Sequence, residues 1–392
     1  MTKILFFNNL YSPDAYGGAE KTMKIIVDGL HEIGYDVVVV ALRPHIKKLE
    51  IEENDYKIYR VPILNIDHEL FTEKLVRHKR IAWKLRDVYN EGQANFVTSI
   101  IEREQPNVIF CHNLAGWSSS LWRVIHEHKI PSIQVVHDLY ILCPRCMFNK
   151  GKSCKSQCLS SRILRLPYKY FSQKISAVVS ISKYIEDTIT QNGYFQSSIK
   201  KVIYNTRIIP SLEIKHKSVY AFGFIGNVMP HKGIEILLEA YHMSSIPVPL
   251  YVAGKCEDRY KQLLLEKINS DERIEFLGYI DSSSFYKKID VAVIPSLWDE
   301  PLGMVAVEAL ASNIPVISTG AGGLSEIVKN EENGLIFKPY NVECLRVCLE
   351  KMYFDNELFQ KLQVGARKSV ETFLNPNRQI WEYDDLIRKL VM

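Results

Sequence analysis

The feature that most constrains the fold of this chain is a repeated alternation of short apolar runs with longer amphipathic stretches. The first half contains the runs KILFFNN, DVVVVAL, NVIFCHN, SIQVVHD, AVVSIS and KVIYN, all rich in Val, Ile or Phe. The second half contains YAFGFIG, PLYVAG, IEFLGYI, DVAVIPS, PVIST and GLIFK. Continuously apolar strands separated by helices are typical of parallel sheets with both faces covered. The sequence therefore predicts an α/β protein with two doubly wound, Rossmann-like parallel-sheet domains.

The alternation is interrupted at about residues 206–218, where the sequence RIIPSLEIKHKSV combines a proline with charges of both signs. We place the domain boundary there, which gives a first domain at 1–210, a second at 211–375 and a terminal helix at 376–392. Polar pairs follow the strands of the first domain: Asn8 and Asn9, His112 and Asn113, His137 and Asp138, Ser182 and Lys183. Ligands of open parallel sheets bind beyond the carboxyl ends of the strands, so we expect these residues to line a cleft between the domains.

Size and composition narrow the class of protein. The 392 residues favour two domains, and 47% hydrophobic with 24% charged residues is typical of a large packed core. A net charge of +4 is too weak to indicate nucleic-acid binding. No apolar run approaches the roughly 18 residues that span a bilayer. The N-terminal MTKILFFNN reads as a strand rather than a signal peptide, so we expect a cytoplasmic protein.

Glycine-rich loops before helices provide candidate phosphate sites. In FGFIGNVMPHKG, Gly226 ends a strand and Lys232 stands where the next helix begins. Helix N-termini favour anions, and a lysine there opposes the helix dipole unless an anion is present. The alternative is a solvated surface lysine. Further glycines open two more helices, Gly17 and Gly18 in the first half, and Gly320, Gly322 and Gly323 ahead of Glu326.

Two glutamates in WDEPLGMVAVEALA carry a second signal. Glu300 lies in a turn-like Asp-Glu-Pro stretch, and Glu308 lies within an otherwise apolar helix, where a carboxylate needs compensation. Two carboxylates placed in this way could accept hydrogen bonds from hydroxyls at opposite ends of an elongated ligand such as a nucleotide-diphosphate sugar. The alternative is a buried Glu–Lys pair that only fixes packing.

These motifs together resemble the retaining glycosyltransferases of family four, which have the GT-B fold. The likeness rests on Glu300 and Glu308 with Pro301 and Gly303 around them, on GNVMPHKG and GGAE, and on the His-Asp pair at 137–138, and it is strongest over about 220–340. The resemblance implies a nucleotide-diphosphate sugar donor, no cofactor or metal in catalysis, and a glycan or lipid-linked acceptor. It also implies that the terminal helix packs back on the first domain.

Carried over by position, the resemblance assigns roles to individual residues. Glu300, His137 and Lys232 would be catalytic, with Glu300 and His137 at the donor sugar and Lys232 at the diphosphate. The donor-binding set would be Gly17, Gly18, Gly226, Asn227, Lys232, Gly303, Glu308, Gly322 and Gly323. In one departure Asn227 stands where the family usually has arginine, so one phosphate-binding cation is missing.

Two rival functions remain open at this point. The first is a non-catalytic nucleotide-sugar-binding subunit, which the asparagine at 227 would suit. The second is a nucleotide-sugar epimerase, which would convert the donor without an acceptor. An NAD dehydrogenase is disfavoured because no Gly-x-Gly-x-x-Gly follows the first strand.

Four clustered cysteines form a separate motif. Cys143, Cys146, Cys154 and Cys158 are separated by two, seven and three residues. Four thiolates suit tetrahedral zinc, so one interpretation is a structural zinc beside the acceptor side of the cleft. The other interpretation is four loop thiols with no metal.

Two stretches mix basic and apolar residues, FTEKLVRHKRIAWKLR and RILRLPYKYFSQK. Such stretches can lie on anionic membranes, although each taken alone favours an ordinary solvated helix face. Peripheral contact with the inner face of a membrane is therefore a hypothesis for the chain.

Overall fold

A computed structural model describes the chain except for residues 15–16, 68–69, 71–74, 150, 214–216 and 392. It divides into two compact units. Unit 1 comprises residues 1–147, 154–205 and 376–392, and unit 2 comprises residues 148–153 and 206–375. The chain therefore passes from unit 1 to unit 2 at Asn205–Thr206, a few residues before the predicted boundary at 210. Residues 148–153, which the sequence placed in the first domain, belong to unit 2.

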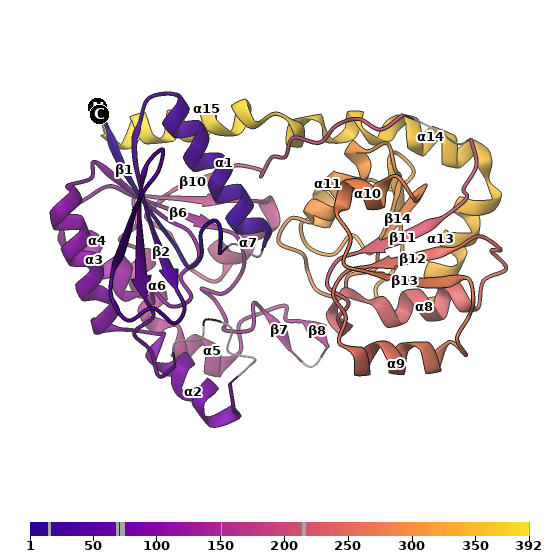
Figure 1. Cartoon of the computed structure of the whole chain (residues 1–392), viewed down its shortest axis with the longest axis horizontal. Helices are drawn as coiled ribbons and strands as arrows, with labels where there is room; N and C mark the ends of the chain where they lie inside the picture. Colours follow the sequence, from indigo (N-terminus) through magenta and orange to yellow (C-terminus); the bar gives the residue numbers. More distant parts are fainter. Residues whose placement is uncertain (15–16, 68–69, 71–74, 150, 214–216, 392) are drawn as a thin grey trace. The chain divides into compact units, whose positions relative to one another are not determined.

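Unit 1 is built on an eight-stranded sheet with the order β10-β9-β6-β5-β1-β2-β4-β3 (Figure 1). The strands are β1 (Lys3–Asn8), β2 (Asp36–Arg43), β3 (Glu50–Glu53), β4 (Lys57–Pro62), β5 (Val108–Cys111), β6 (Ser132–Val136), β9 (Ala177–Ser180) and β10 (Ile199–Val202). All neighbours pair in parallel except β3, which runs antiparallel to β4 at the edge. The apolar runs predicted for this half all form strands, and β3 and β4 are additional.

The helices of unit 1 connect these strands. They are α1 (Gly18–Glu32), α2 (Arg77–Arg86), α3 (Glu91–Glu104), α4 (Ser120–Glu127), α5 (Leu159–Leu164), α6 (Leu166–Ser172), α7 (Lys183–Gln191) and α15 (Pro376–Val391). The terminal helix α15 packs against α1, and the Tyr35 hydroxyl donates to Asp384 Oδ1 at 2.6 Å. None of the described helices is both long and apolar enough to cross a membrane.

Unit 2 contains a six-stranded, wholly parallel sheet with the order β13-β12-β11-β14-β15-β16. The strands are β11 (Phe222–Ile225), β12 (Leu250–Ala253), β13 (Ile274–Gly278), β14 (Val291–Ile294), β15 (Val316–Ser318) and β16 (Gly334–Ile336). Every predicted strand of this half is present. A small hairpin of β7 (Phe148–Asn149) and β8 (Lys152–Ser153) completes the unit.

The helices of unit 2 follow the same pattern. They are the 3-10 turn η2 (Pro230–Lys232), α8 (Ile234–His242), α9 (Asp258–Lys267), α10 (Ser282–Tyr286), α11 (Met304–Ala311), α12 (Leu324–Ile327), α13 (Val342–Phe354), α14 (Asn356–Ala366) and η3 (Lys368–Leu374).

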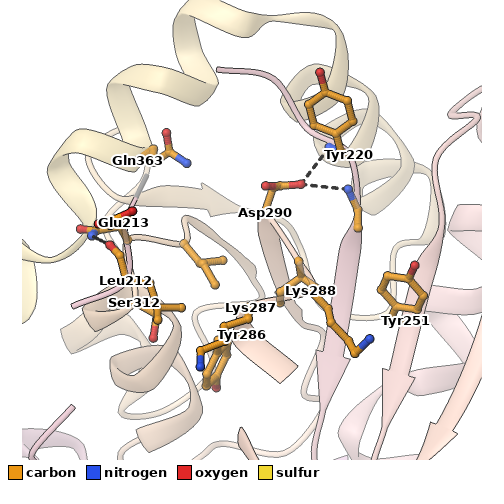
Figure 2. A pocket seen from close by; sticks show the side chains of 14 residues that line it. Leu212, Glu213, Tyr220, Tyr251, Tyr286, Lys287, Lys288, Asp290, Ser312 and Gln363 are labelled. Atoms are coloured by element: carbon orange, nitrogen blue, oxygen red, sulfur yellow. Dashed lines mark hydrogen bonds between the residues drawn. The ribbon is translucent and has the colours of Figure 1, made fainter. Parts of the chain in front are cut away.

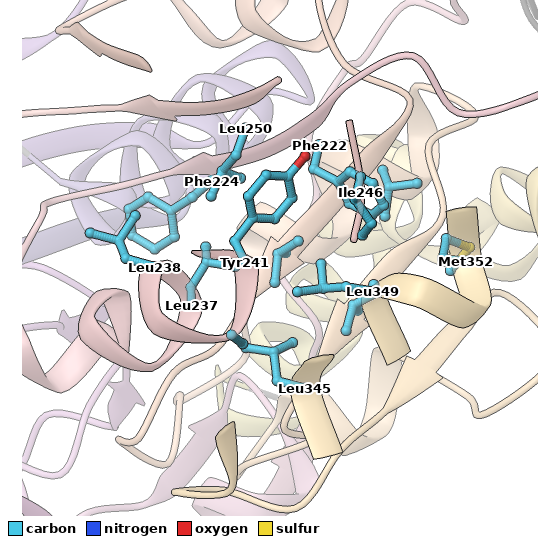
Figure 3. Close-up of a cluster of buried hydrophobic side chains, with 14 of the residues drawn as sticks. Phe222, Phe224, Leu237, Leu238, Tyr241, Ile246, Leu250, Leu345, Leu349 and Met352 are labelled. Carbon is cyan, nitrogen blue, oxygen red and sulfur yellow. The ribbon is translucent and has the colours of Figure 1, made fainter. Parts of the chain in front are cut away.

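The core of unit 2 forms where α8 and α13 pack together beside β11 and β12 (Figure 3). Phe222, Leu237, Tyr241 and Leu349 are each fully buried there. Complete burial of one such side chain contributes roughly 1.5–3 kcal/mol. This packing fixes α8 on the sheet, and with it the loop that precedes the helix.

Candidate active site

The centre of the site in unit 2 is an ion pair between two residues that the sequence singled out separately. Lys232 Nζ lies 2.6 Å from Glu300 Oε1, and the side chains are 25% and 12% exposed. The Ser296 hydroxyl donates to the same carboxylate oxygen at 3.0 Å. Lys232 Nζ also lies 5.3 Å from the centre of the Trp298 ring, within the range of a cation–π contact.

Local structure explains why Lys232 stands at this point. Pro230 begins the 3-10 turn, and the Gly233 amide donates to the Pro230 carbonyl at 3.0 Å. Helix α8 then starts at Ile234, so the lysine precedes the unpaired N–H groups of its first turn. The Leu297 amide donates to the His231 carbonyl at 2.9 Å, which ties this turn to the loop that carries Glu300. The positive charge of Lys232 opposes the dipole of α8, and the carboxylate of Glu300 compensates it. A bound anion would add to that compensation.

The glycine loop after β15 holds Glu300 in place through backbone contacts. Glu300 forms an isolated bridge with Gly322, and the Gly323 amide donates to the Glu300 carbonyl at 2.7 Å. A Cβ added at Gly322, where φ is +62°, would lie 2.5 Å from the Glu300 carbonyl oxygen. The sequence assigned Gly322 and Gly323 to donor binding, and the structure places them against the loop that carries Glu300.

Glu308 lies in the second turn of α11, half-buried, while Glu300 lies in the preceding loop. The sequence predicted this separation, with Gly303 between them as the residue before α11. The Tyr286 hydroxyl is 3.5 Å from Glu308 Oε2 and donates to the Val305 carbonyl at 3.2 Å. The positive charge of Arg207 also acts on Glu308, although burial is what dominates and lowers the pKa of Arg207. A phenol and a guanidinium therefore compensate the carboxylate in the apolar helix.

Tyr286 also borders a hollow of about 200 Å³ near the amino ends of β11 and β14 (Figure 2). Figure 2 shows Asp290 accepting hydrogen bonds there from the backbone amides of Tyr220 and Ala221, at 2.8 and 3.0 Å. The hollow does not include Glu300 or Lys232 among its lining residues. Tyr286 lines this hollow and also approaches Glu308.

A larger hollow of about 500 Å³ adjoins the turn before α8 and contains Asn227. It lies where β11 and β12 end, and the Val228 amide donates to the Lys255 carbonyl at 2.9 Å. Lys255 and Tyr260 share the lining with Asn227. The Gly226 residue before them has φ +150°, and its carbonyl approaches Gly254 closely.

Replacing Asn227 with arginine should strengthen the binding of nucleoside diphosphates by about tenfold. Asn227 is exposed on the rim of this hollow, so a guanidinium fits without displacing core side chains. A charge-assisted hydrogen bond to phosphate contributes roughly 1.5–3 kcal/mol, part of which is offset by ordering the longer side chain. Isothermal titration with a panel of nucleoside diphosphates measures the change, and Asn227→Gln is the uncharged control. Equal affinity of the two variants would contradict the prediction.

The hairpin β7–β8 adds residues that sequence reasoning missed. The Asp299 amide donates to Ser153 Oγ at 2.8 Å, and the Tyr340 hydroxyl donates to the Gly151 carbonyl at 2.8 Å. The Phe148 ring meets the His231 ring edge-on at 5.8 Å between centres. The hairpin thus contacts the residues on either side of the Lys232–Glu300 pair.

In unit 1, the predicted site residue His137 is buried and lies against a second histidine, His112. His137 is 7% exposed, and its Nε2 lies 2.8 Å from His112 Nδ1, with the rings stacked at 5.1 Å. Burial, and secondarily the charge of His137, place the pKa of His112 well below its usual range, so His112 is neutral. Both residues follow neighbouring strands, β5 and β6, at the carboxyl edge where the sequence placed them.

Gly17 and Gly18 lie at the start of α1, as predicted, and a carboxyl group from the same helix accompanies them. A Cβ at Gly17 would lie 2.7 Å from Glu20 Oε2. Burial raises the pKa of Glu20, and hydrogen bonds from the backbone amides of Glu20 and Gly17 partly offset that rise. Glu20 therefore occupies the helix start that the sequence offered to a phosphate.

The zinc interpretation of the four cysteines is not supported. In the described part of the chain, no group of three or more His, Cys, Asp or Glu side chains is placed to hold a metal ion. The Ser161 hydroxyl stands between two of the thiols, 3.4 Å from Cys143 Sγ and 3.2 Å from Cys158 Sγ. Cys146 instead hydrogen-bonds with Asp138. Cys143 and Cys158 thus share a hydroxyl neighbour, and Cys146 pairs with a carboxyl group.

Comparison with known families completes this picture. The family model "Glycosyl transferases group 1" matches residues 206–369, and "Glycosyltransferase Family 4" matches residues 16–206. The chain belongs to the family 4, group 1 glycosyltransferases. The resemblance read from the sequence is therefore confirmed, as is the GT-B fold class.

Two relatives of this glycosyltransferase have descriptions that bear on its function. The "Uncharacterized 42.6 kDa protein in cps region" of Klebsiella pneumoniae is 29% identical over 326 residues, which cover 83% of this chain and 87% of that protein. The capsular polysaccharide biosynthesis glycosyltransferase CapM of Staphylococcus aureus is 29% identical over 171 residues, 42% of this chain and 44% of CapM.

Among solved structures, sucrose-phosphate synthase from Thermosynechococcus elongatus superposes with a TM-score of 0.79 at 19% identity, covering 100% of this chain and 99% of that one. HepE from Anabaena, in complex with UDP and glucose, has a TM-score of 0.71 at 17% identity and 100% coverage of both chains. At these identities the likeness shows the fold alone.

Proposed function

We propose that this glycosyltransferase moves a sugar from a nucleotide-diphosphate sugar to a hydroxyl of a glycan or lipid-linked acceptor, in the synthesis of a cell-surface polysaccharide. The observation that carries the proposal is the Lys232–Glu300 pair at the start of α8, where a cation, a carboxylate and unpaired amides meet. Support comes from the UDP complex of the fold relative HepE. It also comes from the relative in a cps region and from CapM of capsular polysaccharide biosynthesis.

The roles of the residues follow from their chemistry. Lys232 and the first amides of α8 stabilise the negative charge that develops on the departing diphosphate. Glu300 accepts hydrogen bonds from hydroxyls of the donor sugar, and Glu308, held by Tyr286, accepts them from the ribose. His137, which belongs to unit 1, contacts the donor sugar. Cationic protein groups supply the charge that a divalent metal would supply, so we expect transfer to continue in EDTA.

In the proposed reaction, the bond between the anomeric carbon and the diphosphate oxygen breaks. The acceptor hydroxyl bonds to that carbon from the same face, so configuration is retained, and its proton passes to the departing diphosphate. Glu300 and Glu308 act on hydroxyl groups and take no part as nucleophiles. The products are the glycosylated acceptor and a free nucleoside diphosphate.

A thermal-shift screen of nucleoside diphosphates and nucleotide sugars tests the first step. A ligand at a hundredfold its dissociation constant should stabilise the protein by roughly 2.7 kcal/mol. Incubation of the best donor should then release nucleoside diphosphate slowly with water and faster with an acceptor, and NMR of the product gives the anomeric configuration. Tight binding without turnover would favour the non-catalytic subunit that Asn227 suggests. The absence of any stabilising nucleotide would overturn the proposal.

A further inference from the structure

Two sequence segments about 80 residues apart form one groove on unit 1. Helix α2 supplies one wall, and helix α5 together with Pro144 and Arg145 supplies the other. The groove has a volume of about 640 Å³ and is lined by Arg77, Arg80, Ile81, Lys84, Leu85, Pro144, Arg145, Ser160, Ser161 and Leu164. The first basic stretch noted in the sequence therefore supplies three of the groove's cations, whereas the second contributes only Leu164 to its lining.

The described residues that line this groove carry charge of one sign, which is positive. Four of its residues are cationic, and none is acidic. Helix α2 has no acidic residue between Arg77 and Arg86, and α5 and α6 have none either. Asp67 is near Lys79, at 3.7 Å, and Asp87 at the end of α2 is buried with its carboxylate directed to Tyr140 and Gly116. The field over the groove is therefore positive, which attracts anionic partners.

The same surface exposes large apolar side chains. Ile81 and Leu85, one helical turn apart on α2, are 53% and 58% exposed. On the α5 side Leu164 lines the groove, and Leu159 and Ile163 of the same helix are more than half exposed. The opposite side of α2 is anchored by Trp83, which is 1% exposed. Helix α2 is thus fixed to the unit on one side and presents aliphatic side chains between its cations on the other.

We propose that this basic-apolar face is the surface through which the protein docks on a membrane containing anionic phospholipids. Lipid phosphates suit Arg77, Arg80 and Lys84, while Ile81 and Leu85 enter the boundary between headgroups and acyl chains. A nucleic acid would use the cations but leave the aliphatic side chains in water. An acidic protein would need carboxylates matched to the cations of α2 and to Arg145, and would gain nothing from the exposed aliphatic side chains unless it were also apolar there. The inference goes beyond sugar transfer, because docking is measured without donor or acceptor.

Vesicle co-sedimentation of the full chain tests the proposal. The protein should bind vesicles of phosphatidylcholine and phosphatidylglycerol in equal parts, and bind phosphatidylcholine vesicles weakly. The triple variant Arg77→Ser, Arg80→Ser, Lys84→Ser should partition into the anionic vesicles about a hundredfold less, since each cation contributes about a factor of five. The double variant Ile81→Ser, Leu85→Ser should lose binding that persists in high salt.

A charge-matched control keeps the test specific. Lys47, Lys48 and Lys129 are exposed on unit 1 outside the groove, so their triple serine variant removes the same net charge. We expect it to bind anionic vesicles within about threefold of the wild type. Melting temperature and nucleotide affinity, measured on each variant, show that it is folded and that the donor site is intact. Equal loss in the two triple variants, no preference for phosphatidylglycerol, or no effect of the apolar substitutions would each overturn the proposal.

Discussion

Replacing Lys232 with methionine should lower kcat/KM for sugar transfer by about 10²–10³-fold, the usual effect of removing one preorganised group that stabilises developing negative charge. Methionine keeps most of the apolar stem of the side chain but removes the charge, and with it the cation–π contact with the Trp298 ring. The affinity for free nucleoside diphosphate should fall as well, because the ground-state diphosphate carries the same charge. Steady-state kinetics and titration calorimetry measure both effects. Lys361→Met, an exposed lysine on α14 of the same unit, is the control.

A purely structural role for Lys232 makes a different prediction. Glu300 is 12% exposed, so removing its cation leaves a largely buried carboxylate uncompensated and lowers stability. The double variant Lys232→Met, Glu300→Gln removes that unpaired charge and should recover much of the melting temperature. It should not recover transfer. Recovery of kcat/KM together with stability, or a kcat/KM for Lys232→Met within about threefold of wild type, would show that the pair only fixes packing.

The fold could be predicted from the sequence because its signal is local. Each buried parallel strand, such as Asp36–Arg43 or Val291–Ile294, is a continuous apolar run that needs no knowledge of its neighbours. Strands β3 and β4 were missed because neither is a continuous apolar run. Glu50–Glu53 contains three glutamates on an only partly buried edge strand, and Lys57–Pro62 carries Lys57 and Arg60.

The candidate site could be predicted only in part, because its geometry depends on contacts between distant segments. The sequence identified Lys232 and Glu300 in separate arguments, weighing a phosphate site against a solvated lysine for the first and hydroxyl binding against a Glu–Lys pair for the glutamates. A separation of 68 positions hides the fact that Lys232 and Glu300 pair with each other. Hairpin β7–β8 shows the same limit, since nothing in residues 148–153 indicates that they belong with unit 2. Cysteine spacing likewise suggested zinc, but it does not record the Ser161 hydroxyl between two thiols.

Replacing Gly233 with alanine should destabilise unit 2 by about 3–5 kcal/mol. Gly233 has φ +74°, and a Cβ there would lie 1.9 Å from the Pro295 carbonyl oxygen. The obstacle is backbone at the end of β14, so a rotamer change cannot relieve it. The turn carrying Lys232 must move away from the loop carrying Glu300, and nucleotide binding should weaken together with stability.

Gly278 provides the matched control for that substitution. Its φ of +69° is nearly the same, but a Cβ there would have no atom within 4 Å. Gly278→Ala therefore carries the left-handed backbone cost alone, about 1–2 kcal/mol. Urea unfolding of the two variants separates the terms, because their difference isolates the collision with Pro295. If the two variants lose the same stability, the close approach of the α8 turn to β14 is not what positions Lys232, and the ion pair with Glu300 must hold the turn instead.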